Sequence, residues 1–66
     1  MMVEVFISGN KRAMIDLDKI IYFTESHDKE TTWIQFYDGW LQVEEKYEDF
    51  IKKTLSCIEY KMNTIA

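Results

Sequence analysis

The chain has 66 residues, which is enough for one domain over residues 1–66 and leaves no length for a second core. This excludes two-domain enzymes. A domain of this size buries only about 60% of its unfolded surface, so it needs a dense apolar core or a partner. Hydrophobic residues make up 47% of the chain and aromatic residues 15%. The single cysteine, Cys57, cannot form an internal disulfide, and with the lone His27 it falls short of a structural zinc site.

The charge balance disfavours nucleic acid as a partner. Eight Lys and Arg against twelve Asp and Glu give a net charge of −4, so the chain lacks the positive field that supplies most non-specific nucleic-acid affinity. No apolar run is long enough to span a membrane, and the N-terminus lacks the pattern of a signal peptide. We therefore expect a cytoplasmic protein that does not bind membranes.

Alternating apolar and polar residues predict a first β-hairpin over residues 2–17. The loop length follows from which side chains must share the core face. A two-residue loop, 9–10, would set Ile7 opposite Arg12. A three-residue loop, 9–11, is the better prediction because it gives apolar pairs: Ile7 with Ala13, Val5 with Ile15 and Val3 with Leu17.

A third strand and a second hairpin follow. Residues 20–25 are β-branched and aromatic enough for a strand, and residues 26–31 are a polar loop. The pair Asp38-Gly39 is the strongest short hairpin signal, and it predicts a two-residue type I′ turn between strands 32–37 and 40–43. The predicted core face pairs Phe36 with Leu41 and Ile34 with Val43.

From about residue 44 the apolar period becomes helical and continues to about residue 63. The predicted apolar stripe consists of Tyr47, Phe50, Ile51, Thr54, Leu55, Ile58, Met62 and Ile65. The fold class is therefore α+β: an antiparallel meander of four to five strands, arranged as hairpin, strand and hairpin over residues 2–43, with one C-terminal amphipathic helix on one face.

We identify no catalytic, cofactor-binding or metal-binding constellation. Cys57 lies beside the apolar stripe, and nothing in the sequence brings it to His27 as nucleophile and base. Glu44 and Glu48 lie one helical turn apart, but an acidic helix start is more often a partner of the helix dipole. The chain is therefore predicted to act by binding and to need no cofactor.

The aromatic residues on the second face of the sheet are the most informative feature. They form a predicted apolar patch on the side away from the helix, where a small monomer rarely leaves such a patch exposed. Trp, Tyr, Phe and Met are residues that protein interfaces favour. A covering loop and base stacking are the alternatives. The predicted protein interface consists of Phe6, Met14, Trp33, Tyr37 and Trp40, and a homodimer with both tryptophans near its centre is expected.

Four acidic residues near the predicted helix start form a second candidate surface. They fall within six positions, opposite in sign to what a phosphate or an anionic membrane attracts. A basic protein is the better electrostatic match. The predicted partner-facing acidic residues are Glu44, Glu45, Glu48 and Asp49.

Several stretches resemble known families. Four stretches resemble the small flagellar FlbD-like family: Val5–Lys11, Ile15–Ile20, Thr32–Gly39 and Val43–Glu45. This resemblance implies the order strand, turn, strand and C-terminal helix. Leu17–Leu55 resembles the repeated element of LytTR DNA-binding domains. The chain is also similar to small proteins of Gram-positive prophages, which implies an inhibitor that targets a host protein.

Two functional hypotheses follow. The first is a small non-enzymatic interaction protein, a regulator or a phage-type inhibitor of a host protein. The alternative, implied by the LytTR and FlbD-like resemblances, is a nucleic-acid-binding transcriptional or flagellar regulator. A steep salt dependence of nucleic-acid binding would distinguish the second from the first.

Overall fold

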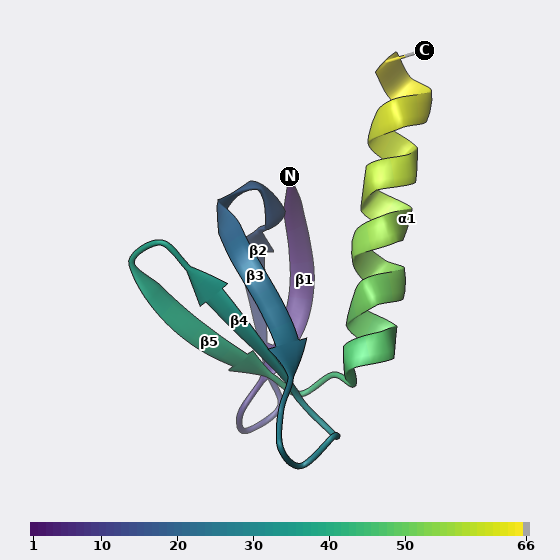
Figure 1. The fold of residues 1–66 in the computed structure, drawn as a ribbon. Coiled ribbons are helices and arrows are strands. Elements are labelled where there is room, and N and C mark those ends of the chain that lie inside the picture. The colour runs from purple at the N-terminus through teal and green to yellow at the C-terminus, as the bar shows by residue number, and fades with distance from the viewer. Residues whose placement is uncertain (66) are drawn as a thin grey trace.

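Five antiparallel strands and one C-terminal helix make up the structure (Figure 1). The computed structural model describes the backbone of residues 1–65 and the side chains of residues 1–57. The elements are β1 (Met2–Ile7), β2 (Lys11–Asp16), the short 3-10 helix η1 (Leu17–Lys19), β3 (Ile20–Glu25), β4 (Thr32–Phe36), β5 (Gly39–Val43) and α1 (Tyr47–Ile65). This confirms the predicted α+β class.

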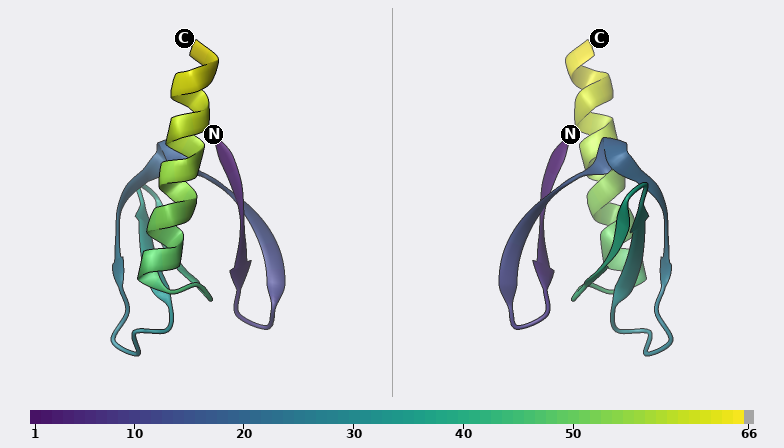
Figure 2. Two further views of the ribbon diagram at one scale, coloured as in Figure 1. Left: turned by 90° about the vertical axis from the view of Figure 1, so that its right-hand side faces the viewer. Right: turned by 90° about the vertical axis from the view of Figure 1, so that its left-hand side faces the viewer.

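The strand order is β2-β1-β5-β4-β3, so the predicted simple meander is wrong. Strands β3, β4 and β5 do follow one another in space, but β1 inserts next to β5 through one registered pair, Ile7 with Val43. The adjoining Glu44 N–H donates to the Phe6 carbonyl at 2.7 Å. The β1–β2 hairpin and the β3–β4–β5 unit therefore splay apart from this junction on either side of α1 (Figure 2).

The first hairpin keeps the predicted faces but changes the predicted partners. Its loop has three residues, as predicted, but it runs over residues 8–10, so Val5 pairs with Ala13 and Val3 with Ile15. Gly9 and Asn10 both adopt positive φ, at 79° and 57°. Gly and Asn tolerate this conformation best, and the loop therefore centres on them while Lys11 begins β2. Since the partners shift by two residues, the core face is unchanged.

The second hairpin differs from its prediction in the same way. The turn residues are Tyr37 and Asp38 instead of Asp38 and Gly39, so Phe36 pairs with Gly39 and Ile34 with Leu41. Neither turn residue has positive φ, so the turn is not type I′. The Gln35 side chain closes it by donating from Nε2 to the carbonyls of Phe36 and Gly39, each at 3.0 Å.

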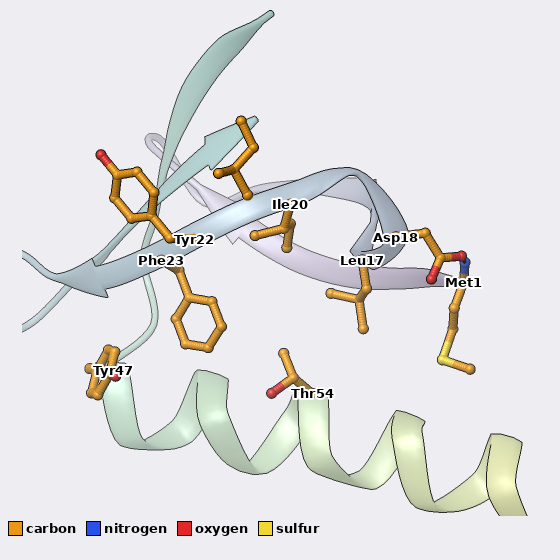
Figure 3. Close-up of a pocket in the computed structure, with 9 residues that line it drawn as sticks. Met1, Leu17, Asp18, Ile20, Tyr22, Phe23, Tyr47 and Thr54 are labelled. Carbon is orange, nitrogen blue, oxygen red and sulfur yellow. Dashed lines mark hydrogen bonds and ion pairs between the residues drawn. The ribbon is translucent and has the colours of Figure 1, made fainter. Parts of the chain in front are cut away.

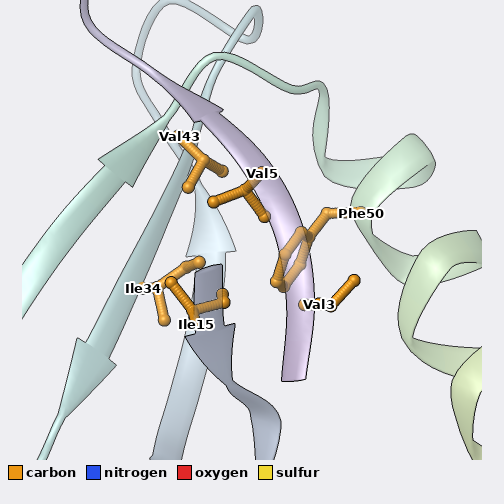
Figure 4. Close-up of a cluster of buried hydrophobic side chains, with 6 residues drawn as sticks. All are labelled: Val3, Val5, Ile15, Ile34, Val43 and Phe50. Carbon is orange, nitrogen blue, oxygen red and sulfur yellow. The ribbon is translucent and has the colours of Figure 1, made fainter. Parts of the chain in front are cut away.

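The core lies between the concave side of the sheet and α1 (Figure 4). Phe50 projects from the helix toward Val3 on β1, and it is fully buried. Of the four residues predicted to face the helix from the second hairpin, Ile34 and Val43 are buried, and Phe36 and Leu41 are half-buried against them. The buried apolar residues are Val3, Val5, Ile15, Ile34, Val43 and Phe50.

The packed face of α1 is rotated relative to the predicted stripe. Leu55, predicted to face the core, is 52% exposed, whereas Cys57 packs against the core cluster. The rings of Tyr47 and Phe50, which belong to the predicted stripe, both contact Phe23, with centroids 5.7 Å and 4.8 Å away. The other predicted stripe residues, Ile58, Met62 and Ile65, lie outside the residues whose side chains are described.

Helix α1 begins at Tyr47, three residues later than predicted, so Glu44 and Glu45 belong to the connection from β5. Thr32 fixes this connection by donating from its hydroxyl to the Glu45 carbonyl at 2.8 Å. Within the part of the chain that is described, no helix is long and apolar enough to cross a membrane.

Candidate interaction surface

The strand register places three aromatic side chains on the side of the β3–β4–β5 unit away from the core. Tyr22 pairs with Gln35 and Trp33 with Gln42, and Gln35 pairs in turn with Trp40. These positions alternate with Ile34 and Phe23, which face inward, so they point outward together. We call Tyr22, Trp33 and Trp40 the outer aromatic face.

Trp33 and Trp40 stack on each other within this face. Their ring centroids are 4.3 Å apart and the rings are nearly parallel, at 9°. Their positions are diagonal in the β4–β5 ladder, at the range over which large aromatic side chains meet. Trp40 forms the outer side of the stack and is 60% exposed, whereas Trp33 is half-buried. The two tryptophans therefore form one rigid apolar surface.

Polar contacts hold the strands around this stack in place. Gln35 is tied to the β4–β5 turn, and Gln42 donates from Nε2 to the Thr31 hydroxyl at 2.7 Å. A cavity of about 340 Å³ lies beside Trp33. Its lining comes from the loop after β3 and from neighbouring strands, and consists of Glu25, Ser26, His27, Asp28, Trp33 and Gln42.

Asp28 orders this loop. One of its carboxylate oxygens, Oδ1, accepts the backbone N–H groups of Glu30 at 2.9 Å and Thr31 at 3.1 Å, and the Thr31 hydroxyl also donates to the carboxylate. The hydrogen bond from Glu30, followed by those from Thr31, lowers the pKa of Asp28 below its usual value. The loop that borders Trp33 is thereby fixed from within.

The structure separates the other predicted interface residues from the tryptophan stack. Phe6 and Met14 are exposed on β1 and β2, on one side of the β1–β5 junction. Because β1 and β5 are antiparallel, Trp40 lies along β5 on the other side of that junction. Tyr37 is 93% exposed in the turn after β4 and does not lie on a strand. The predicted single patch is therefore divided.

The sequence prediction missed Tyr22 and its neighbour Ile21. Tyr22 is 52% exposed and Ile21 is 59% exposed. Their exposure depends on a register shift between Ile20 and Tyr22, where β3 carries an extra residue opposite β4. Alternation in residues 20–25 could have placed the Tyr22 side chain on the other face of the sheet from Phe23. No sequence signal marks the extra residue.

Three of the four predicted acidic surface residues are exposed, and the fourth is not. Glu44, Glu48 and Asp49 face solvent. The side chain of Glu45 is only 13% exposed and pairs with the Lys53 ammonium at 2.6 Å. Its other oxygen, Oε2, is buried and accepts no hydrogen bond from the described residues. Glu45 therefore serves the fold and is not available to a partner.

A second cluster of charges joins the N-terminus to η1. The Met1 amino group contacts Asp18 at 2.6 Å and Asp16 at 3.0 Å. Both hydrogen bonds raise the pKa of the amino group, and the one to Asp18 contributes more than the one to Asp16. The amino group in turn lowers the pKa of Asp16, as does the N–H of Asp18. Met1 and Asp18 also line a groove that is bordered by Tyr22 of the outer aromatic face.

The structure does not assemble a catalytic or metal-binding group from the candidates. His27 is exposed in the loop after β3, while Cys57 is half-buried on α1 against the core. Among the described residues, no group of three or more His, Cys, Asp and Glu side chains is placed to hold a metal ion.

No family model matches the chain, and neither the curated proteins nor the solved structures contain a significant match. The resemblances to FlbD-like proteins, LytTR domains and prophage proteins therefore stay predictions.

Proposed function

We propose that this chain is a small, non-enzymatic protein-interaction module of the cytoplasm that binds through its outer aromatic face. It acts as a regulator or as a phage-type inhibitor of a host protein. A homodimer with Trp33 and Trp40 near its centre covers the face in the absence of another partner.

The observation that supports this proposal is the exposed tryptophan stack. Large aromatic side chains on a rigid strand surface lose little conformational entropy on binding, and Trp is the residue most enriched among interface hot spots. The stack also lies on the side of the sheet that α1 does not cover. Trp40, at 60% exposed, still has most of its surface to bury.

The dimer is tested by replacing Trp40 with alanine. We expect Trp40→Ala to weaken the dimer by about 2 kcal/mol or more, roughly thirtyfold in dissociation constant, because a central aromatic anchor is lost. Met14→Ala is the matched control: Met14 is 57% exposed but lies on the other side of the β1–β5 junction. Sedimentation equilibrium over a range of concentrations measures both variants.

Two results contradict the dimer. One is a monomer at every concentration, with the exposed Trp40 ring freely accessible to a quencher in solvent. The other is an equal loss of affinity in Trp40→Ala and Met14→Ala, which would contradict the placement of the tryptophans at the centre of the dimer. The first result leaves the outer aromatic face as a docking site for a different protein.

A further inference from the structure

Helix α1 is longer than the sheet that it packs against. It runs from Tyr47 to Ile65, a span of about 28 Å at a rise of about 1.5 Å per residue. Its C-terminal half extends past the ends of the strands (Figure 1, Figure 2). The described side chains that pack against the core from α1 include Phe50 and Cys57, in the earlier part of the helix. The sheet of the same chain therefore does not lie alongside the later part.

The sequence of α1 carries a heptad pattern on a side of the helix other than the core side. Apolar residues recur at spacings that alternate between four and three, as the a and d positions of a coiled coil do. We call these positions the heptad stripe, which consists of Ile51, Leu55, Ile58, Met62 and Ile65. Leu55 is 52% exposed although it belongs to this apolar pattern. The pattern fits packing against a second helix.

The groove that Tyr22 borders runs beside the heptad stripe. It has a volume of about 530 Å³ and lies between β3 and α1, with Phe23 on one wall and Tyr47 and Thr54 on the other (Figure 3). Since successive helical residues are rotated by about 100°, Thr54 comes between the core side of α1 and Ile51. The groove therefore opens on the same side of the helix as the heptad stripe.

We propose that α1 pairs with α1 of a second copy in an antiparallel arrangement, with Leu55 of each copy level with Ile58 of the other. The same two-fold axis sets Ile51 level with Met62, so the heptad stripes of the two copies form four apolar layers. Each copy contributes the same residues to such a contact. The stripe is a different surface from the tryptophan stack, so this contact does not rest on the proposed function.

This register also fits the length of the helix. Residues 59–65 of each copy run alongside residues 48–54 of the other, which is the part of α1 that borders the groove. The half of each helix that extends past its own sheet is thus placed beside the groove of the second copy. Two heptads are short for a free coiled coil, and the groove walls supply further apolar surface. A parallel pair would set the two protruding halves against each other, away from both grooves.

Charges beside the stripe match a second copy in this orientation. Lys52 and Glu59 each follow a d position of the stripe and therefore occupy e positions. In an antiparallel pair the e positions of the two helices lie on the same side of the contact. Lys52 of each copy then lies about 3 Å along the axis from Glu59 of the other, whereas the two Glu59 positions are about 7.5 Å apart along it. Two ion pairs form. In a parallel pair e positions adjoin g positions, and Glu59 would instead meet Thr54.

Sedimentation equilibrium of the full chain carrying Trp40→Ala tests the pairing, because this substitution weakens association through the tryptophan stack. We expect the Trp40→Ala chain still to form a dimer as its concentration rises. Adding Leu55→Asp should weaken this dimer by about thirtyfold or more, because an unpaired carboxylate from each copy enters the apolar layers. Ser56→Asp is the matched control: Ser56 is also exposed on α1 but lies off the stripe, so the dissociation constant should not change.

A charge-reversal series in the same Trp40→Ala chain tests the orientation. Lys52→Glu and Glu59→Lys each turn both ion pairs into like-charged pairs, and each should weaken the dimer by roughly three- to tenfold at low salt. Combining the two substitutions remakes both ion pairs with their signs exchanged, and should restore the dissociation constant. Positions 52 and 59 are about 10 Å apart along one helix, so this rescue reports a contact between two chains.

Three results overturn the inference. A Trp40→Ala chain that is monomeric at every concentration would leave the proposed function intact and place association on the outer aromatic face alone. Equal dissociation constants for the Leu55→Asp and Ser56→Asp chains would exclude the heptad stripe. Failure of the double charge reversal to restore the dimer would exclude the antiparallel register. If circular dichroism shows the Leu55→Asp chain to be unfolded, the charge-reversal series decides alone.

Discussion

Phe50 is the side chain through which α1 contacts both halves of the sheet. It is fully buried, it meets the Phe23 ring edge to face at 4.8 Å, and it projects toward Val3 on β1. Strands β1 and β5 share only one registered pair, so few backbone contacts connect the two halves. Packing around this one ring therefore holds the two halves of the sheet together, a role that a longer β1–β5 ladder would otherwise share.

Replacing Phe50 tests this role. We expect Phe50→Ala to cost about 3–5 kcal/mol, comparable to the whole stability of a domain this small, and the variant to be largely unfolded. Phe36→Ala should cost at least about 1 kcal/mol less, because Phe36 is only half-buried. Urea unfolding followed by circular dichroism compares the two. Equal losses, or a larger loss for Phe36→Ala, would contradict this account of the core.

At the scale of the elements, Lys53 ties the helix to the sheet at two points. Its ammonium pairs with Glu45 at 2.6 Å and donates to the Glu4 carbonyl on β1 at 2.8 Å. Glu45 in turn lies in the connection that leads from β5 into α1. The contact therefore joins the helix, the connection and the first hairpin through a partly buried charge.

Loss of the Lys53 cation should lower the stability of the fold more than loss of the neighbouring Lys52 cation. We expect Lys53→Met to destabilise the fold by roughly 1–3 kcal/mol, because the carboxylate of Glu45 stays largely buried without a counter-charge. Lys52→Met is the control, since Lys52 is exposed one position away. In a thermal unfolding series, adding Glu45→Gln to Lys53→Met should recover part of the loss. Equal melting temperatures for the two single variants would show that the contact does not stabilise the fold.

For the whole molecule, we expect the positions of the charges to affect the binding of a basic partner more than the net charge does. Glu44, Glu48 and Asp49 remain exposed near the start of α1, while Glu45 is withdrawn. We expect the association rate of a basic ligand to depend on which negative charges are removed, because charges at the rim of an interface act mainly on the association rate.

Two triple variants with the same net charge test the cluster. One changes Glu44, Glu48 and Asp49 to Lys, and the other changes the exposed residues Glu4, Glu25 and Asp38 to Lys. We expect the first to slow association with a lysine-rich peptide more than the second, with the difference shrinking at high salt. Stopped-flow fluorescence of the tryptophans measures both rates. Equal rates at low salt would show that net charge alone governs the encounter.

The sequence by itself determined the order of the elements and the core faces of the two hairpins. Strand and helix periods differ, and alternation in the two hairpins assigned Val5, Ile15, Ile34 and Val43 to the core face. This assignment survived even where the predicted partners were wrong, because both hairpins shifted by two residues and a shift of two preserves the face. Trp33 and Trp40 were placed together for the same reason.

The tertiary structure alone decided which elements meet. The insertion of β1 beside β5, and the rotation of α1 that packs Cys57 against the core and exposes Leu55, depend on contacts between residues distant in sequence. The inward turn of Glu45 depends on its pairing with Lys53 of the helix. A local pattern shows which side of an element is apolar, but it does not say which other element covers that side. The same limit explains why Phe6 and Met14 were joined to the tryptophans.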